Sequence, residues 1–247
     1  MILTASNLIS VASIWLLVAV VGASYYETNV NAPTLDPHNR NALRLEPYKW
    51  PDGIVPYRFA DSCDQQYRSA VLDAMNVLHQ ASCVHFIPKT PEQVEHIEFG
   101  KSELGCGSNI GYRSEQREPL EVFLDDFCVG LPGAIQHELL HVLGLFHEHT
   151  RPDRDEYVEV LWDNIEPEFR RNFVKGSWDY METFGLPYDF GSVMHYPSYA
   201  FARPGTKETM VSRQNRTAQL GQTDGASELD LEKVRRMYKC DGLSSDN

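Results

Sequence analysis

The sequence predicts an α+β protein. Three observations support this fold class. Short β-rich stretches alternate with two helical patterns between residues 54 and 143, an aromatic stretch at 188–196 has no helical period, and an amphipathic helix closes the chain at 227–238. The length of 247 residues is enough for one large domain or two subdomains with a sizeable core.

Residues 1–23 are expected to be a signal peptide. Ile9 to Val21 is an apolar run of about signal-peptide length, and small residues precede a cut after Ala23. No Lys or Arg stands ahead of this run, so a signal anchor is the alternative, although the run is short for a membrane span. Residues 24–40 are polar and predict a tail or short pro-segment. The protein is therefore expected to be secreted.

The first half of the chain predicts four strands and a long helix. The strands are expected at Ile54–Phe59, Val84–Ile87, His96–Phe99 and Glu121–Leu124, with a loop at Gly105–Ser108. The helix is expected at about Gln65–Ala81, opened by Asp61-Ser62, with Val71, Leu72, Met75 and Leu78 at helical spacing. The last strand is expected to offer an exposed edge to an extended peptide; the alternative is a paired inner strand.

The second half predicts fewer elements. Asp163–Phe173 is expected to be a helix, and Ser227–Tyr238 is expected to be the closing helix, with Ser227 as its cap and Asp230 three residues further on.

The stretch 133–148 predicts a helix that carries a metal site. His137 and His141 are four residues apart, so they share one helix face, and Glu138 beside them can hold a water without being a ligand. Gly144 can end the helix with a positive φ and bring His147 round as a third ligand. Three neutral imidazoles with an open position are typical of catalytic zinc. The alternative, a core helix with polar histidines, gains nothing from clustering them.

Charge and cysteine content limit the function classes. The net charge of −13 argues against nucleic-acid binding, because 35 acidic residues outnumber the 22 Lys and Arg that could meet phosphates. After the first segment, no run is long and apolar enough to cross a membrane. Five cysteines in a secreted chain predict two disulfides and one further thiol. Asn215-Arg216-Thr217 is a candidate glycosylation site.

Two motifs together point to a family. The first is His137-Glu138-x-x-His141-x-x-Gly144-x-x-His147-Glu148-x-x-Arg151-x-Asp153-Arg154-Asp155, and the second is Ser192-Val193-Met194-His195-Tyr196. They resemble the signature and the Met-turn of the astacin family within the metzincin zinc peptidases. Other metzincins share the three histidines but lack the Glu after the third and the Tyr two residues after the Met. Leu145 stands where astacins usually have Phe.

The resemblance runs from about Asn41 to Cys240 and implies a metzincin, astacin-like catalytic domain at 41–247. Residues 41–144 would carry a twisted mixed sheet and the active-site helix. Residues 145–247 would be mostly irregular apart from the closing helix, and the cleft between the two subdomains would hold zinc and an extended peptide. A monomer with one Zn²⁺ is expected, as is a protein or peptide substrate.

The resemblance also implies residue roles. His137, His141 and His147 would bind zinc, and Glu138 would be the general base of a zinc-dependent endopeptidase that uses a zinc-activated water. Tyr196 would be a movable zinc ligand that stabilises the oxyanion; the alternative is a packed turn aromatic. Met194 would form an apolar floor under the metal. The rival functions are a secreted, non-catalytic binding protein that keeps the astacin fold, and a structural zinc protein.

The cysteine pairing is implied in the same way. By resemblance, Cys83 would pair with Cys240, and Cys106 with Cys128. Cys63 has no partner in the family and is expected to be a buried free thiol; the alternative is an intermolecular bridge.

Processing of a zymogen is the next implication. The family pattern places the new N-terminus at Asn41, after Arg40, where its ammonium would pair through water with Glu148. Residues 24–40 lack the Phe-x-Gly-Asp motif with which astacin pro-segments commonly hold latency.

Arg203 suggests a substrate preference. It falls where tolloid-like astacins carry a basic residue in the pocket just past the cut, which implies a preference for Asp or Glu there. The alternative is a solvated loop arginine.

Overall fold

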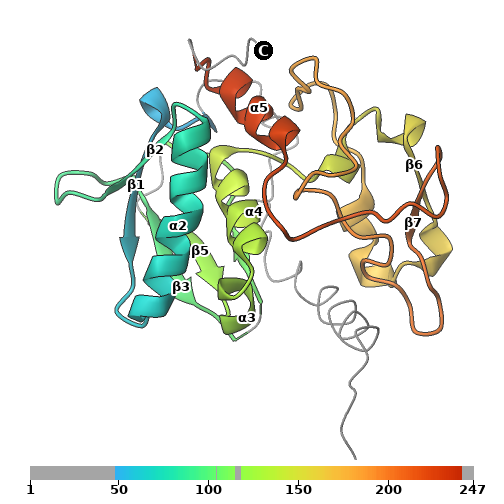
Figure 1. The fold of residues 1–247 in the computed structure, drawn as a ribbon, viewed down its shortest axis with the longest axis horizontal. Coiled ribbons are helices and arrows are strands. Elements are labelled where there is room, and N and C mark those ends of the chain that lie inside the picture. The colour runs from blue at the N-terminus through green and yellow to red at the C-terminus, as the bar shows by residue number, and fades with distance from the viewer. Residues whose placement is uncertain (1–47, 104, 115–117, 241–247) are drawn as a thin grey trace, which may run out of the picture.

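The computed structural model describes residues 48–103, 105–114 and 118–240. A sheet and its covering helices form one side of the molecule, and less regular chain forms the other (Figure 1). The expected signal peptide, the pro-segment and Asn41 lie outside the described residues. Within the described part of the chain, no helix combines the length and apolar character needed to cross a membrane.

The sheet has five strands in the order β2-β1-β3-β5-β4. Four are parallel to one another: β1 (Ile54–Phe59), β2 (His85–Pro88), β3 (Ile97–Lys101) and β5 (Leu120–Leu124). The fifth, β4 (Gly107–Ser108), runs antiparallel to β5, so the sheet is mixed, as expected for this fold class.

The expected exposed edge at Glu121–Leu124 is wrong. β5 is paired on both sides, and the edge strand next to it is β4, which lies in the stretch expected to be a loop. Gly107 and Ser108 pair with Phe123 and Val122. Two residues with small side chains give no alternating pattern, so the pairing is visible only in the tertiary structure.

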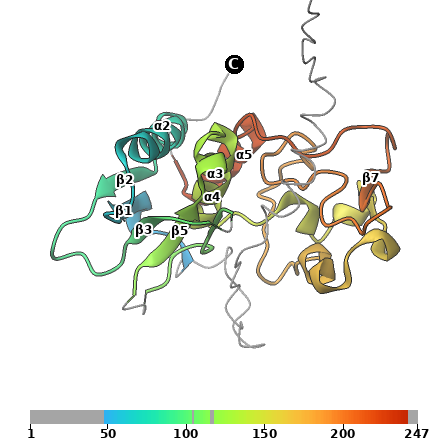
Figure 2. The ribbon, with the colours of Figure 1, turned by 90° about the horizontal axis from the view of Figure 1, so that it is seen from below.

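Helices cover one face of the sheet. Figure 2 shows α2 (Gln65–Ala81), α3 (Asp126–Val129) and α4 (Pro132–Leu143) on the same side of the strands. The cap of α2 is Asp64, whose carboxylate accepts from the Tyr67 amide, and not Asp61-Ser62 as expected. Leu72 is 43% exposed, so it does not belong to the buried stripe. The residues of α2 that are buried are Tyr67, Val71, Ala74, Met75 and Leu78.

Residues 145–227 have little regular secondary structure and consist mostly of turns and short 3₁₀ segments. Their two-stranded sheet pairs β6 (Val158–Val160) with β7 (Met210–Ser212). The expected helix at Asp163–Phe173 is wrong in type, because this stretch forms two 3₁₀ segments, Trp162–Asn164 and Pro167–Phe173. Between them, Ile165 pairs with Ala202 in a β-bridge. The next residue, Glu166, precedes Pro167, and the α conformation is disfavoured for a residue before proline.

Two hydrophobic clusters form the core. The first joins the sheet, α2 and α4 to Val193, Met194 and the closing helix α5 (Glu228–Met237). The second, around Phe173, Tyr196 and Phe201, belongs to the less regular half. The other 3₁₀ segments of the described residues are Pro51–Gly53, Glu148–Thr150 and Arg154–Glu156.

Two disulfides connect the positions implied by the resemblance. One joins Cys83 to Cys240, just past α5, and the other joins Cys106 to Cys128. Cys63 is unbridged and buried, as expected. Its thiol donates to the Phe99 carbonyl oxygen at 3.3 Å.

Candidate metal centre

Helix α4 carries the first two histidines and ends where the sequence predicts. Pro132 opens it, and Gly144 ends it with φ 107°. The Gly144 amide donates to the His141 carbonyl and the Leu145 amide to the Leu140 carbonyl, a left-handed helix ending that a residue with a Cβ rarely adopts. The chain then turns back, which brings His147 to the same place as the helix histidines.

Three imidazoles converge. The Nε2 atom of His147 lies 3.2 Å from the Nε2 atoms of both His137 and His141. The three residues are the one group of ligand-type side chains within the described residues that could hold a metal ion.

The hydrogen bonds of these rings fit a cation. His137 Nδ1 lies 2.8 Å from the Val193 carbonyl oxygen, and His141 Nδ1 lies 2.7 Å from the Leu145 carbonyl oxygen. Each Nδ1 therefore donates, which leaves the Nε2 lone pairs of both rings directed at the cluster. A proton on His147 could bridge to only one of them. A metal ion satisfies all three, and imidazole nitrogen is a preferred zinc ligand.

Burial keeps these rings neutral. It lowers the pKa of His137 to about 4, and burial together with His137 lowers the pKa of His141 to about 3. Burial also lowers the pKa of His147 well below its usual value. Neutral imidazole is the form that binds metal.

Glu138 faces the edge strand of the sheet. The Ser108 hydroxyl on β4 lies 2.8 Å from Glu138 Oε2. Burial raises the pKa of Glu138 to about 7, while the Ser108 hydrogen bond lowers it. A carboxylate poised near neutral pH is suited to accept and return a proton.

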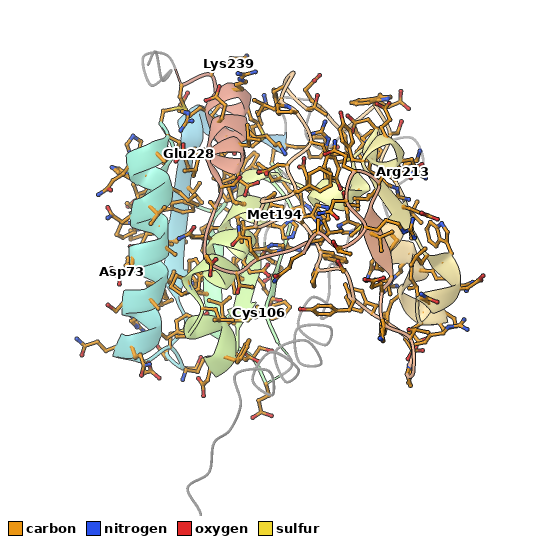
Figure 3. All side chains as sticks on the ribbon, turned by 45° about the vertical axis from the view of Figure 1, so that its right-hand side comes forward. Asp73, Cys106, Met194, Arg213, Glu228 and Lys239 are labelled. Carbon is orange, nitrogen blue, oxygen red and sulfur yellow. A yellow bond between two sulfur atoms is a disulfide. The ribbon has the colours of Figure 1, made fainter. Side chains whose placement is uncertain are left out.

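The Met-turn, residues 192–196, contacts both the histidines and helix α5. Met194 is fully buried and lies between the two halves of the molecule (Figure 3). The Val193 amide donates to Asp230 Oδ2 at 2.9 Å, while the Val193 carbonyl accepts from His137. The Glu148 amide donates to the Met194 carbonyl at 2.9 Å. The turn therefore ties the first histidine and the residue after the third to the start of α5.

Tyr196 lies among aromatic rings beside the third histidine. Its ring centroid is 4.5 Å from that of His147 and 4.0 Å from that of His149, on which it stacks. The rings of Phe173 and Phe201 contact it edge-on. The phenol therefore lies next to the three-histidine cluster.

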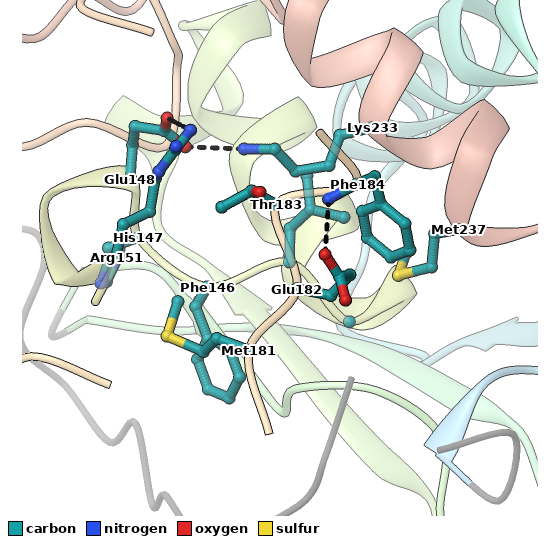
Figure 4. Close-up of a pocket in the computed structure, with 12 residues that line it drawn as sticks. Phe146, His147, Glu148, Arg151, Met181, Glu182, Thr183, Phe184, Lys233 and Met237 are labelled. Atoms are coloured by element: carbon teal, nitrogen blue, oxygen red, sulfur yellow. Dashed lines mark hydrogen bonds and ion pairs between the residues drawn. The ribbon is translucent and has the colours of Figure 1, made fainter. Parts of the chain in front are cut away.

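Glu148 lies at the wall of a pocket formed by residues 144–148, which follow α4, by residues 181–184 and by α5 (Figure 4). Its carboxylate is buried and accepts from Lys233, from Arg151 and from the Asp189 amide. Burial alone would raise the pKa of Glu148, but Lys233 and Arg151 hold it below its usual value. Asn41, its expected partner, lies outside the described residues.

Arg203 and Asn215 lie away from the histidines along the chain. Arg203 Nε donates to the Ile165 carbonyl at 3.1 Å, and no carboxylate of the described residues forms an ion pair with it. It follows Phe201, whose ring contacts Tyr196. Asn215 is exposed, and its side-chain oxygen accepts from Thr217.

The sequence did not predict the roles of three residues at this centre, which are Ser108, Lys233 and Asp230. Ser108 and Lys233 lie 30 and 85 positions from their partners, with no local signal. Asp230 has a local signal, since it completes the capping box with Ser227, but its bonds to Ser192 and Val193 follow only from the fold.

Comparison with known proteins adds independent findings. The family model described as Astacin (peptidase family M12A) matches residues 43–239. The chain is 40% identical over 205 residues to zinc metalloproteinase nas-14 of Caenorhabditis elegans, covering 81% of this chain and 40% of that protein. It is 37% identical over 213 residues to the low choriolytic enzyme of Oryzias latipes, covering 83% and 75% respectively. The match thus spans less than half the length of the nas-14 protein.

A solved structure agrees with the fold. High choriolytic enzyme 1, a hatching enzyme zinc-protease from Oryzias latipes, superposes with a TM-score of 0.70 at 29% identity, covering 78% of this chain and 93% of that one.

Proposed function

The chain belongs to the astacin family, peptidase family M12A, and from this premise we propose that it cleaves internal peptide bonds of a protein or peptide substrate. The observation that carries the proposal is the convergence of the His137, His141 and His147 Nε2 atoms, with the buried Glu138 next to His137 in the same helix. The alternative interpretation as a structural zinc protein fits less well, because a closed structural site has four protein ligands and this group has three.

The three histidines would hold one zinc ion, the metal named for nas-14 and for high choriolytic enzyme 1. Bound there, zinc supplies a Lewis acid that polarises a carbonyl and makes water more acidic. Val193 and Leu145 carbonyls fix the rings of His137 and His141 in the orientation that this binding needs.

Glu138 would be the general base. It would take a proton from the attacking water and return it to the leaving amine, a task for which a pKa near 7 is suitable. Ser108 holds the carboxylate in place from the edge strand.

Tyr196 would stabilise the oxyanion that forms on the substrate carbonyl. A phenol beside the third histidine can donate a hydrogen bond to that charge. The buried Met194 would form the apolar floor beneath the histidines.

Arg203 would favour an acidic residue just after the cut. Its guanidinium is oriented by the Ile165 carbonyl and forms no ion pair with a carboxylate of the described residues, so it is available to a substrate carboxylate. Cleavage-site profiling of wild type, Arg203→Ala and the exposed Arg213→Ala control tests this. The preference should weaken only in Arg203→Ala; an unchanged preference would refute the assignment.

Secretion and processing are part of the proposal. Residues 1–23 would be removed as a signal peptide and 24–40 as a pro-segment, leaving a monomeric catalytic domain at 41–247 with subdomains 41–144 and 145–247. Two disulfides suit an oxidising compartment, and the exposed Asn215 would be open to glycosylation. N-terminal sequencing of active protein tests the start at Asn41; a start several residues away would contradict it.

The function is tested by hydrolysis of a quenched peptide library with secreted, processed protein. We expect cleavage that a zinc chelator abolishes and added zinc restores. Glu138→Ala should lose cleavage while keeping zinc, whereas Glu92→Ala, an exposed control, should retain it. No cleavage by folded, zinc-loaded wild type would favour the non-catalytic binding protein.

A further inference from the structure

The carboxylate of Glu148 is buried, and both of its oxygens accept hydrogen bonds. Only 1% of its side chain is exposed. Oε2 accepts from Lys233 Nζ at 2.6 Å, and Oε1 accepts from Arg151 Nη1 at 2.9 Å and from the Asp189 amide at 3.0 Å. In Figure 4, Lys233 reaches from α5 across the pocket to this carboxylate.

Lys233 supplies the positive charge that neutralises the ionic groups around Glu148. Arg151 also binds Asp153 through two parallel hydrogen bonds, of 2.9 and 2.7 Å, so its single charge is shared between two carboxylates. The two carboxylates, of Glu148 and Asp153, and the two cations, of Arg151 and Lys233, sum to zero charge. Without Lys233, one buried negative charge would be left without a counter-cation. An uncompensated buried charge is strongly unfavourable.

The neighbouring carboxylates have other donors. Asp230 accepts from the Ser192 hydroxyl and the Val193 amide, and also from the Ser227 amide at the start of α5. Asp189 accepts from the Ser227 hydroxyl and from the Gly191 amide. Glu182, at the pocket wall, accepts from the Phe184 amide. None of them forms an ion pair with Lys233 in the described residues.

We propose that Lys233 supplies, from within the domain, the counter-cation of Glu148, so that the metal centre is ordered without the ammonium of a new N-terminus. The inference rests on the proposed peptidase function. Lys233 is a positioning residue: it acts through Glu148, which directly follows His147 and whose amide holds the Met194 carbonyl. An ammonium at Asn41 would have to displace Lys233 or add a second, unneeded cation.

The test compares two N-termini on one protein. A specific protease site is placed in the full chain so that cutting after folding leaves either Asn41 or Gly-Ser-Asn41 as the first residue. For wild type we expect kcat values for a peptide substrate within about twofold of each other, because Lys233 already neutralises Glu148. A loss of roughly tenfold or more in the extended form would overturn the proposal.

Variants at Lys233 test the same claim independently. Lys233→Met keeps the chain length but removes the charge, and its extended form should lose kcat by roughly tenfold or more with KM little changed, while Lys233→Arg should restore it. Lys207→Met is the exposed control. Full activity of extended Lys233→Met would overturn the proposal. Wild type that is inactive in both forms would instead refute the peptidase function, which separates the two failures.

Discussion

The Nδ1 atom of His137 lies 2.8 Å from the carbonyl oxygen of Val193, 56 positions further along the chain. This contact joins the metal helix to the Met-turn, and the Val193 amide continues it to Asp230 at the start of α5. The orientation of a metal ligand thus depends on the cap of the closing helix. Such supporting contacts typically change metal affinity when they are lost.

Asp230→Ala is therefore expected to weaken both stability and metal binding. The Ser192, Val193 and Ser227 donors would lose their buried acceptor, at a cost of about 2–4 kcal/mol in the free energy of unfolding. Zinc affinity should fall by roughly tenfold or more. Denaturant unfolding and competition with a chelator measure the two effects. The exposed Glu228→Ala on the same helix is the control, and equal zinc affinity in both variants would contradict the connection.

Ser108→Ala is expected to move the acid limb of the pH profile. Burial raises the pKa of Glu138 and the Ser108 hydroxyl lowers it, so removal of the hydroxyl raises the pKa further. A base works without its proton, so the acid limb of kcat/KM should shift to higher pH. Ser69→Ala, at an exposed position of α2, is the control. A limb that stays in place or moves to lower pH would show that the hydroxyl does not act on Glu138.

Tyr196→Phe should lower kcat with little change in KM. The phenyl ring keeps the stack on His149 and the contact with His147, so that only the hydroxyl is lost. Loss of one oxyanion donor costs roughly 10²–10³ in kcat. Steady-state kinetics beside Tyr57→Phe, on the distant strand β1, measure the effect. Unchanged kcat would leave Tyr196 as a packed turn aromatic.

Loss of the Cys83–Cys240 disulfide should destabilise the fold. It joins positions 157 residues apart and fastens the chain just past α5. Replacing both cysteines with serine should cost about 2–5 kcal/mol of unfolding free energy. Cys63→Ser, which removes the unbridged thiol, should cost less than about 1.5 kcal/mol. Thiol labelling of denatured, unreduced wild type should find one thiol, and three would contradict the pairing.

The parts of the fold that the sequence predicts are those with local signals. The α4 helix has histidines one turn apart and Gly144 at a position that needs positive φ, so its end and the return of His147 follow from the sequence. The cap of α5 is equally local, since Ser227 and Asp230 lie three residues apart. The disulfides and the Met-turn could be assigned only because two motifs resemble a family.

The parts that were missed depend on distant segments. The edge strand β4 is two small residues, and its identity as a strand comes from pairing with β5. Residues 163–173 have helical spacing, yet Pro167 and the bridge of Ile165 to Ala202 divide them. The partners of Glu138 and Glu148 lie on other elements, so neither Ser108 nor Lys233 could be connected to the site from sequence.

The most direct test of the central claim is anomalous diffraction at the zinc absorption edge from crystals of the protein. We expect one strong peak per chain, roughly 2.0–2.1 Å from the Nε2 atoms of His137, His141 and His147, with Glu138 outside bonding distance. A peak elsewhere, or no peak beside these histidines in zinc-loaded protein, would contradict the assignment of this centre.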